Sequence, residues 1–317
     1  MKNKLVKIFG LMTVGLSLMV LLGGCAIVTL ENPYQKADKV AKKSPKDIKV
    51  GVSLSTLSNP FFIAIKDGIL NVAKENGSTV QVFDAQNDTA KQNNDVEDMI
   101  QKKVDVLIIN PVDSSAISPE VKAANDAGIP VITVDRSSDA GKVLALVASD
   151  SREGGQMAAD FMIKQLGKNA KIAELQGTPG ASATRERGAG FDDAVKGKLK
   201  IVAKQTANFD RAKGLTTSEN IIQGHADIKG MFSQNDEMAL GAVQGLKGHE
   251  DVMIVGFDGS EDGIKAVKNG QMAATVAQQP DKMGELAIQA AYDYFADKSV
   301  PKDIKSPLEL VVNKQYK

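Results

Sequence analysis

The residues best suited to chemistry are polar side chains that follow short apolar runs of the sequence. They are mostly acids, amides and arginines, with a few phenylalanines among them and no histidine. The chain has no G-x-S-x-G, G-x-G-x-x-G, H-E-x-x-H or phosphate-loop motif, and no carboxylate pair in a recognisable hydrolase pattern. The set comprises Ser55, Asn59, Phe61, Phe62, Asn110, Pro111, Asp135, Arg136, Arg185, Arg187, Phe209, Asp210, Gln234, Asn235, Asp236, Asp258 and Gln278.

This mixture of side chains suits an uncharged ligand with several hydroxyl groups. Each hydroxyl both donates and accepts hydrogen bonds, while carboxylates accept, guanidinium groups donate and amides do both. Phenylalanine rings can stack on the apolar C–H faces of a sugar ring. A buried site of this kind rejects analogues that lack one hydroxyl, because its own polar groups would lose their partners. The side chains therefore indicate binding of a neutral polyol.

Alternating strands and helices are expected to position these residues. Apolar runs predict strands over residues 50–54, 79–83, 104–109, 130–134, 143–148, 171–175, 201–205, 228–232, 252–257, 273–277 and 308–312. Helical spacing predicts helices over residues 60–75, 91–103, 116–127, 153–165, 185–195, 211–222, 237–246, 262–268 and 281–296. This number of strands is too large for one small open sheet. We therefore expect an α/β fold of two doubly wound parallel-sheet lobes, with ligands bound beyond the carboxyl ends of the strands.

The first 25 residues have the pattern of a targeting segment. Three lysines precede an apolar run over residues 8–22, which at about 15 residues is shorter than the roughly 20 of a membrane-spanning helix. The run ends in Leu-Gly-Gly-Cys, and Cys25 is the one cysteine of the chain. This ending resembles the lipobox of bacterial lipoproteins, in which the cysteine is lipidated. The alternative is an ordinary secretory signal with a chance cysteine.

Composition excludes several classes of function. The chain has 39 basic and 39 acidic residues, so it lacks the basic excess of a nucleic-acid-binding protein. One cysteine and two histidines leave no internal disulfide and no cysteine-based zinc cluster, and almost nothing for a histidine metal site. We expect no cofactor and no metal.

Eight segments in order resemble the type I periplasmic binding proteins, in particular those that bind ribose. They are STLSNPFF (55–62), INPVDSSA (109–116), VITVDR (131–136), LQGTPGASATRERGAGF (175–191), NFDRAKGL (208–215), QNDEMALGA (234–242), VGFDG (255–259) and TVAQQPDKMG (275–284). The resemblance runs over residues 47–315. Departures lie elsewhere, in the lipobox and in a shorter loop over residues 248–252.

The resemblance implies two lobes joined by three crossovers near Ser149, Gln279 and Pro307. The expected parts are a signal peptide (1–24), a lipidated cysteine with a tether (25–46), an N-terminal lobe (47–149 with 280–307) and a C-terminal lobe (150–279 with 308–317). By the same resemblance the lobes close over a monosaccharide, with D-ribose favoured over related aldoses, and deliver it to an ABC permease. The protein is expected to be a monomer, held on the outer face of the bacterial cell membrane by lipid at Cys25.

The resemblance also implies a role for each site residue. Phe61, Phe62 and Phe209 would sandwich the sugar. Ser55 and Asn110 would line the site. The residues that would hydrogen-bond the hydroxyls and ring oxygen are Asn59, Asp135, Arg136, Arg187, Asn235, Asp258 and Gln278.

Residue patterns alone leave other interpretations open. Asp135-Arg136 could be a surface turn, Phe209 could be a buried anchor, and Arg185 is interpreted as structural. Since adjacent residues do not share a helix face, one of Phe61 and Phe62 could face the sheet and the other the cleft.

Three other functions compete with that of a ribose receptor. An enzyme is disfavoured because no catalytic motif is present. A lac-type transcription regulator shares the fold, but a signal peptide stands here where such a regulator has its helix-turn-helix. A receptor for another aldose or for a furanose-like signalling molecule keeps the binding class and changes the ligand.

Overall fold

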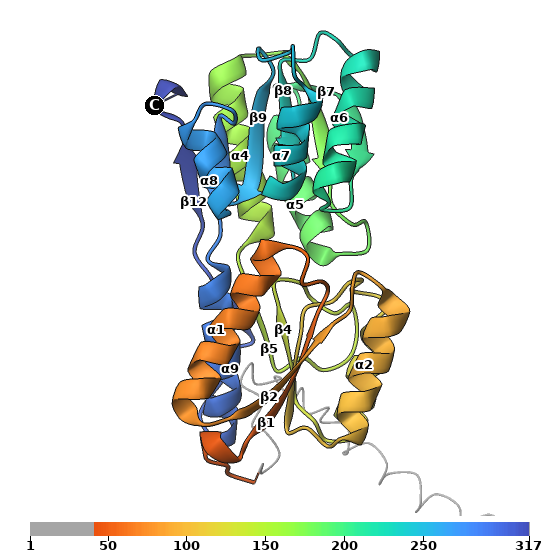
Figure 1. The fold of residues 1–317 in the computed structure, drawn as a ribbon, viewed down its shortest axis with the longest axis vertical. Helices are drawn as coiled ribbons and strands as arrows, with labels where there is room; N and C mark the ends of the chain where they lie inside the picture. The colour runs from red at the N-terminus through yellow and green to blue at the C-terminus, as the bar shows by residue number, and fades with distance from the viewer. Residues whose placement is uncertain (1–40, 317) are drawn as a thin grey trace, which may run out of the picture. The chain divides into compact units, whose positions relative to one another are not determined.

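The computed structural model describes residues 41–316, which contain two six-stranded sheets with helices packed against them (Figure 1). The strands of the first sheet lie in the order β11-β5-β4-β3-β1-β2. They are β1 (Lys49–Leu54), β2 (Thr79–Asp84), β3 (Val106–Ile109), β4 (Val131–Val134), β5 (Ala145–Ala148) and β11 (Asp303–Lys305). The helices α1 (Pro60–Asn76), α2 (Thr89–Gln101), α3 (Ser118–Asp126) and α9 (Pro280–Phe295) belong to this sheet, and a short 3-10 turn, η1 (Pro45–Asp47), precedes it.

The second sheet repeats this arrangement with strand order β12-β10-β9-β8-β6-β7. Its strands are β6 (Lys171–Gln176), β7 (Lys200–Thr206), β8 (Gly230–Ser233), β9 (Met253–Asp258), β10 (Ala274–Ala277) and β12 (Glu309–Val312). Its helices are α4 (Ser151–Leu166), α5 (Ser182–Val195), α6 (Arg211–Gly224), α7 (Asp236–Gly245) and α8 (Glu261–Lys268), followed by η2 (Lys314–Tyr316).

The chain passes between the two sheets three times. It leaves the first sheet after β5, returns after β10 to form α9 and β11, and crosses again to place β12 in the second sheet. These passages lie next to Ser149, Gln279 and Pro307, where crossovers were expected. The predicted class, two doubly wound lobes joined by three crossovers, is confirmed.

Two details of the sheets differ from the prediction. Strand β11 was missed because it has three residues, two of them charged and exposed, so it carries almost no hydrophobic pattern. Strand β12 was predicted over residues 308–312 as part of a parallel sheet, but it pairs antiparallel with β10. Its antiparallel direction follows from the third crossing, which enters the second sheet without a helix between strands β11 and β12.

Successive side chains of the central strands point to opposite faces of each sheet, so each sheet has a hydrophobic core layer on both faces. Ile108 of β3 packs in the cluster that α1 and α9 cover, whereas its neighbours Leu107 and Ile109 pack in the cluster of α2 and α3. Strands buried on both faces read as continuous apolar runs, as β3 does with Val-Leu-Ile-Ile. Covering both faces leaves the strand ends as the places where polar side chains can gather.

Close helix contacts fix the position of these strand ends. A Cβ atom at Gly155 of α4 would lie 2.1 Å from the carbonyl oxygen of Arg187 in α5, so the two backbones touch at this point. The starts of α1, α2, α4, α6, α7 and α8 are fixed by side-chain caps. Asp88 accepts a hydrogen bond from the Lys91 amide, which starts α2 at Thr89, two residues earlier than the apolar spacing suggested.

Within residues 41–316, no helix has the length and apolar character needed to span a membrane. The predicted signal peptide, Cys25 and most of the tether lie outside the described residues.

Candidate ligand-binding site

Side chains from both sheets line one small cavity beyond the carboxyl ends of the strands. Ten of the twelve predicted site residues line it, and Ala183 joins them. The cavity measures about 20 Å³, enough for about one water molecule. The lining residues are Asn59, Phe61, Phe62, Asp135, Arg136, Ala183, Arg187, Phe209, Asn235, Asp258 and Gln278.

The start of α1 supplies the amide and the two rings of the first sheet. Asn59 is the N-cap, and its side-chain oxygen accepts a hydrogen bond from the Phe61 amide at 2.9 Å. Pro60 at the first helical position favours a helix start here. Phe61 and Phe62 pack edge to face with centroids 5.4 Å apart. Both rings are buried in the core cluster and both line the cavity, so neither faces the sheet alone.

Asp135 and Arg136 follow β4 and are buried, which excludes the surface turn. Asp135 has a left-handed backbone (φ 64°), and its Oδ2 lies 3.4 Å from Arg136 Nε. Arg136 Nη1 donates to the carbonyl oxygen of Pro111 at 2.9 Å. The guanidinium carbon of Arg136 lies 5.1 Å from the centroid of the Phe62 ring and 5.3 Å from that of Phe209. In this conformation the arginine therefore lies against the rings that were expected to sandwich the ligand.

The second sheet supplies the opposite wall. Arg187 of α5 has its guanidinium carbon 3.5 Å from the centroid of the Phe257 ring, and its Nη1 donates to the carbonyl oxygen of Gln234. Asn235 caps α7 by accepting from the Met238 amide at 2.9 Å. The Nδ2 of Asn235 donates to the carbonyl oxygen of Phe209 at 3.3 Å, which ties the half-buried Phe209 to the cavity wall.

Asp258 and Gln278 complete this wall at the ends of the adjacent strands β9 and β10. Gln278 Nε2 donates to Asp258 Oδ1 at 3.0 Å. The backbone of Asp258 has φ 115°, a conformation that side-chain-bearing residues rarely adopt. Such conformations gather at sites where a side chain must take one orientation.

Ser55 and Asn110 are not brought to the cavity wall. Asn110 lies behind Asp135, where its Nδ2 donates to the Val134 carbonyl oxygen at 3.0 Å and to Asp135 Oδ2 at 3.3 Å. Its Oδ1 accepts from the Ser55 amide at 3.3 Å. In this conformation both residues support Asp135. Strand-end position alone cannot separate a residue that lines a cavity from one immediately behind it.

The sequence did not indicate the roles of four contributors, although Pro111 and Gln234 were among the strand-end residues. Ala183 lines the cavity, but an alanine has no chemical signature. Pro111 and Gln234 act through backbone carbonyl oxygens that hold Arg136 and Arg187. Phe257 lies under Arg187 and belongs to an apolar run that indicated only a strand.

The site balances two buried acids with two buried arginines. Burial is the largest influence on all four groups. It raises the pKa of Asp135, against the opposing effects of Arg136 and Arg187, and raises the pKa of Asp258 well above its usual value, against that of Arg187. Burial also lowers the pKa of both arginines. When all four groups are ionised their charges cancel, so an uncharged ligand leaves the balance intact.

Both arginines keep a donor that makes no hydrogen bond. The Nε atoms of Arg136 and Arg187 are buried and have no hydrogen-bond acceptor within residues 41–316. Buried donors that lack an acceptor are costly and call for an explanation. A hydroxyl-bearing ligand in the cavity would supply acceptors.

A second set of contacts joins the two sheets beside the cavity. The Ser114 amide donates to the Gly180 carbonyl oxygen at 3.0 Å, and the Ser182 amide donates to Ser114 Oγ at 3.1 Å. Arg185 Nη2 and Asp139 Oδ1 form an exposed ion pair at 2.7 Å. Arg185 therefore contacts the other lobe and does not line the cavity.

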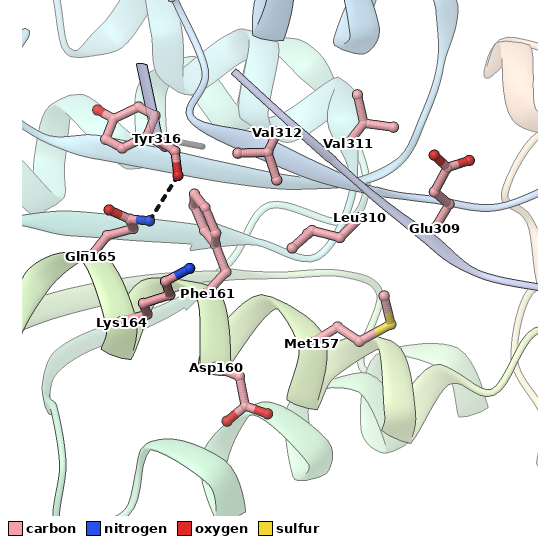
Figure 2. Close-up of a pocket in the computed structure, with 10 residues that line it drawn as sticks. All are labelled: Met157, Asp160, Phe161, Lys164, Gln165, Glu309, Leu310, Val311, Val312 and Tyr316. Carbon is pink, nitrogen blue, oxygen red and sulfur yellow. Dashed lines mark hydrogen bonds between the residues drawn. The ribbon is translucent and has the colours of Figure 1, made fainter. Parts of the chain in front are cut away.

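A larger hollow lies elsewhere, between α4 and the edge strand β12 (Figure 2). Met157, Phe161, Leu310 and Val312 contribute apolar surface to it, and Gln165 Nε2 donates to the Tyr316 carbonyl oxygen at 3.1 Å. None of the predicted site residues lines this hollow, so its size does not make it the candidate site. Within the described part of the chain, no cluster of three or more histidine, cysteine or acidic residues could hold a metal ion.

Two α/β lobes with a polar ligand-binding cavity between them are typical of periplasmic binding proteins, and comparisons with known proteins agree. Residues 50–299 match the family described as periplasmic binding protein domain, and the chain belongs to this family. It is 51% identical to the ribose import binding protein of Bacillus subtilis over 295 residues, 93% of this chain and 95% of that protein. It is 45% identical to the protein of the same name from Escherichia coli over 289 residues, 90% of this chain and 98% of that protein.

A solved structure shows the same fold. An ABC transporter solute binding protein from Mycobacterium smegmatis with bound glycerol superimposes with a TM-score of 0.81 at 37% identity. The match covers 85% of this chain and 95% of that one. Glycerol, like a sugar, is an uncharged polyol.

Proposed function

We propose that this protein is an extracytoplasmic receptor that captures D-ribose between two lobes and delivers it to an ABC importer. The observation that carries the proposal is the charge-balanced cavity wall, in which acids, arginines, amides and phenylalanine rings from both sheets meet. The similarity to two ribose import binding proteins over nine-tenths of the chain supports the choice of sugar.

Each group of the wall has a task in this proposal. Carboxylate oxygens of Asp135 and Asp258 accept hydrogen bonds from sugar hydroxyls, while the Nε atoms of Arg136 and Arg187, which make no hydrogen bond in the present conformation, donate to sugar oxygens. The ring faces of the phenylalanines cover the apolar C–H faces of the sugar. The site holds the sugar and leaves its bonds unchanged, so intact ribose is recovered after incubation with the protein.

Capture requires motion, because nearly all of the residues that line the cavity are buried and the cavity has room for about one water molecule. The proposed rigid bodies are an N-terminal lobe (47–149 with 280–307) and a C-terminal lobe (150–279 with 308–317), which part at the three crossovers to admit the sugar. Arg136 then moves away from the rings that it contacts here. Binding favours the closed form, and the permease recognises that form.

Affinity measurements across sugars test the proposal. Titration calorimetry should give micromolar or tighter binding of D-ribose, equivalent to roughly −8 kcal/mol or better. Other pentoses and hexoses should bind at least about tenfold more weakly, because each missing or inverted hydroxyl leaves a buried partner unpaired. Tighter binding of another aldose would show that this aldose, and not ribose, is the ligand. If no sugar binds, the proposal is wrong.

The membrane anchor is a separate part of the proposal. Cys25 carries the lipid, and residues 26–46 tether the domain to the outer face of the cell membrane. Two or more acyl chains, at about 0.8 kcal/mol per buried CH₂, suffice for stable anchoring. Cys25→Ser should move the protein from the membrane fraction to the medium or periplasm. If the Cys25→Ser protein stays with the membrane to the same extent, the anchor lies elsewhere.

A further inference from the structure

Asp236 is a buried carboxylate next to the candidate site, but it does not line the cavity. It is the first residue of α7, directly after the capping residue Asn235, and its side chain is inaccessible to solvent. Within residues 41–316 it has no ion-pair partner, and burial raises its pKa to about 6. Burying a carboxylate without a cation is costly, so its hydrogen bonds must account for its presence.

Those hydrogen bonds hold the segment that follows β9. Asp236 Oδ2 accepts from the Ser260 amide at 2.8 Å and from Ser260 Oγ at 3.0 Å. Asp236 Oδ1 accepts from Thr275 Oγ1 of β10 at 2.7 Å. Thr275 Oγ1 in turn accepts from the Gly259 amide at 3.3 Å. The carboxylate thus joins α7, β10 and the backbone immediately after Asp258.

The contacts of Asp236 lie next to two residues of the cavity wall, Asp258 and Gln278. Asp258 precedes Gly259 and has the φ of 115° noted above, which persists only where surrounding contacts over-determine it. Gln278 lies three residues after Thr275 and hydrogen-bonds to Asp258. The absence of a side chain at Gly263 leaves room for the carboxylate. A Cβ atom at this position would lie only 2.1 Å from Asp236 Oδ2.

We infer that Asp236 is a positioning residue for sugar binding, which holds the ends of β9 and β10 so that Asp258 and Gln278 face the cavity. This inference rests on the proposed function. It assigns to Asp236 an effect on affinity that passes through Asp258, without any contact between Asp236 and the sugar.

A double-mutant cycle measured by titration with D-ribose tests this coupling. Asp236→Ala should weaken binding about 10- to 100-fold, because Asp258 loses its fixed orientation. In an Asp258→Ala background the same change should weaken binding less than about threefold, because the group that it positions is already absent. Phe62→Leu in the other lobe serves as the control background, where Asp236→Ala should keep its full effect.

The outcomes separate this inference from the proposed function. Failure of the unaltered protein to bind any sugar would overturn both. Ribose binding by the unaltered protein, with equal effects of Asp236→Ala in the presence and absence of Asp258, would overturn the positioning role alone. If the Asp236→Ala protein does not fold, Thr275→Val replaces it in the same cycle, since it removes the bridging hydroxyl at nearly constant volume. Equal effects of Thr275→Val in both backgrounds would likewise overturn the inference.

Discussion

Replacing Asp135 by asparagine should abolish most of the ribose affinity, because it removes a charge from the buried wall and keeps its shape. Asp135 Oδ2 lies 3.4 Å from Arg136 Nε, and Arg136 is 4% exposed. At an effective dielectric constant of about 20, charges at that distance attract by roughly 5 kcal/mol before desolvation is counted. Removing one partner of a buried pair typically costs about 2 to 5 kcal/mol in binding.

That cost corresponds to about a 30- to 4,000-fold weaker affinity. Titration calorimetry with D-ribose measures it, and the thermal unfolding midpoint of the ligand-free protein checks that the fold survives. Asp98→Asn is the matched control. It removes an acid of α2 whose ion pair with Lys102, the residue after this helix, is half exposed; such a pair contributes about 0–1 kcal/mol to stability and nothing to binding.

Two results would refute this reasoning. Affinity of Asp135→Asn within about threefold of the unaltered protein would show that the carboxylate charge does not serve binding. An equal loss in Asp98→Asn would show that affinity responds to surface charge in general. Arg136→Ala and Asp135→Ala should both abolish measurable binding. Near-native affinity in both variants would show that the ligand does not bind at this cavity.

Four further predictions concern lobe closure, helix packing, and the pH dependence of binding and of stability. Asp139→Asn breaks the exposed ion pair with Arg185 and should weaken ribose binding only about 2- to 5-fold, through faster dissociation in stopped-flow measurements. Gly155→Ala should push α5 outward, lowering both the unfolding temperature and the ribose affinity; an unchanged melting curve would contradict the close contact. Ribose affinity should fall as the pH is lowered through the raised pKa of Asp258, because protonation of this carboxylate removes an acceptor. The contribution of Asp236 to stability has the opposite sign: its folded pKa of about 6 exceeds its ordinary value of 3.8, so the contribution is full below about pH 4 and is lost as pH rises through 6. Urea denaturation at pH 5 and 7, with Asp236→Asn as control, measures it.

Much of the architecture could be predicted because each element has its own periodic signal. Strands buried on both faces appear as uninterrupted apolar runs, and the turns to helices are marked by capping residues. The rule that ligands bind beyond strand ends then selected Asn59, Asp135, Arg136 and Asp258 as candidates before any geometry was known. The assignment of Phe209 depended on family resemblance, since its residue type and position alone equally suggest a buried anchor.

What could not be predicted depends on contacts between distant segments. Ala183 lines the cavity only because α5 passes beside it. The hydrogen bond from Ser114 to Gly180 joins two backbone atoms, which every residue type supplies, and the Ser182 bond to Ser114 Oγ needs two segments that are far apart in sequence. The direction of β12 is decided by the third crossing, and the strand pattern is the same in either direction. The coupling of Asp236 to Asp258 requires three segments that are far apart in sequence to meet.

The threefold passage of the chain between the sheets has a consequence for its biosynthesis. A nascent chain that has emerged as far as residue 279 has completed five strands of the first sheet but lacks α9, whose Met283, Ala287 and Ile288 are fully buried in that core. The N-terminal lobe therefore cannot complete its core during synthesis until the residues after 279 have been made. Truncation near the C-terminus should damage both halves together, and neither half exists as one continuous stretch of the gene that could be cut out and used alone.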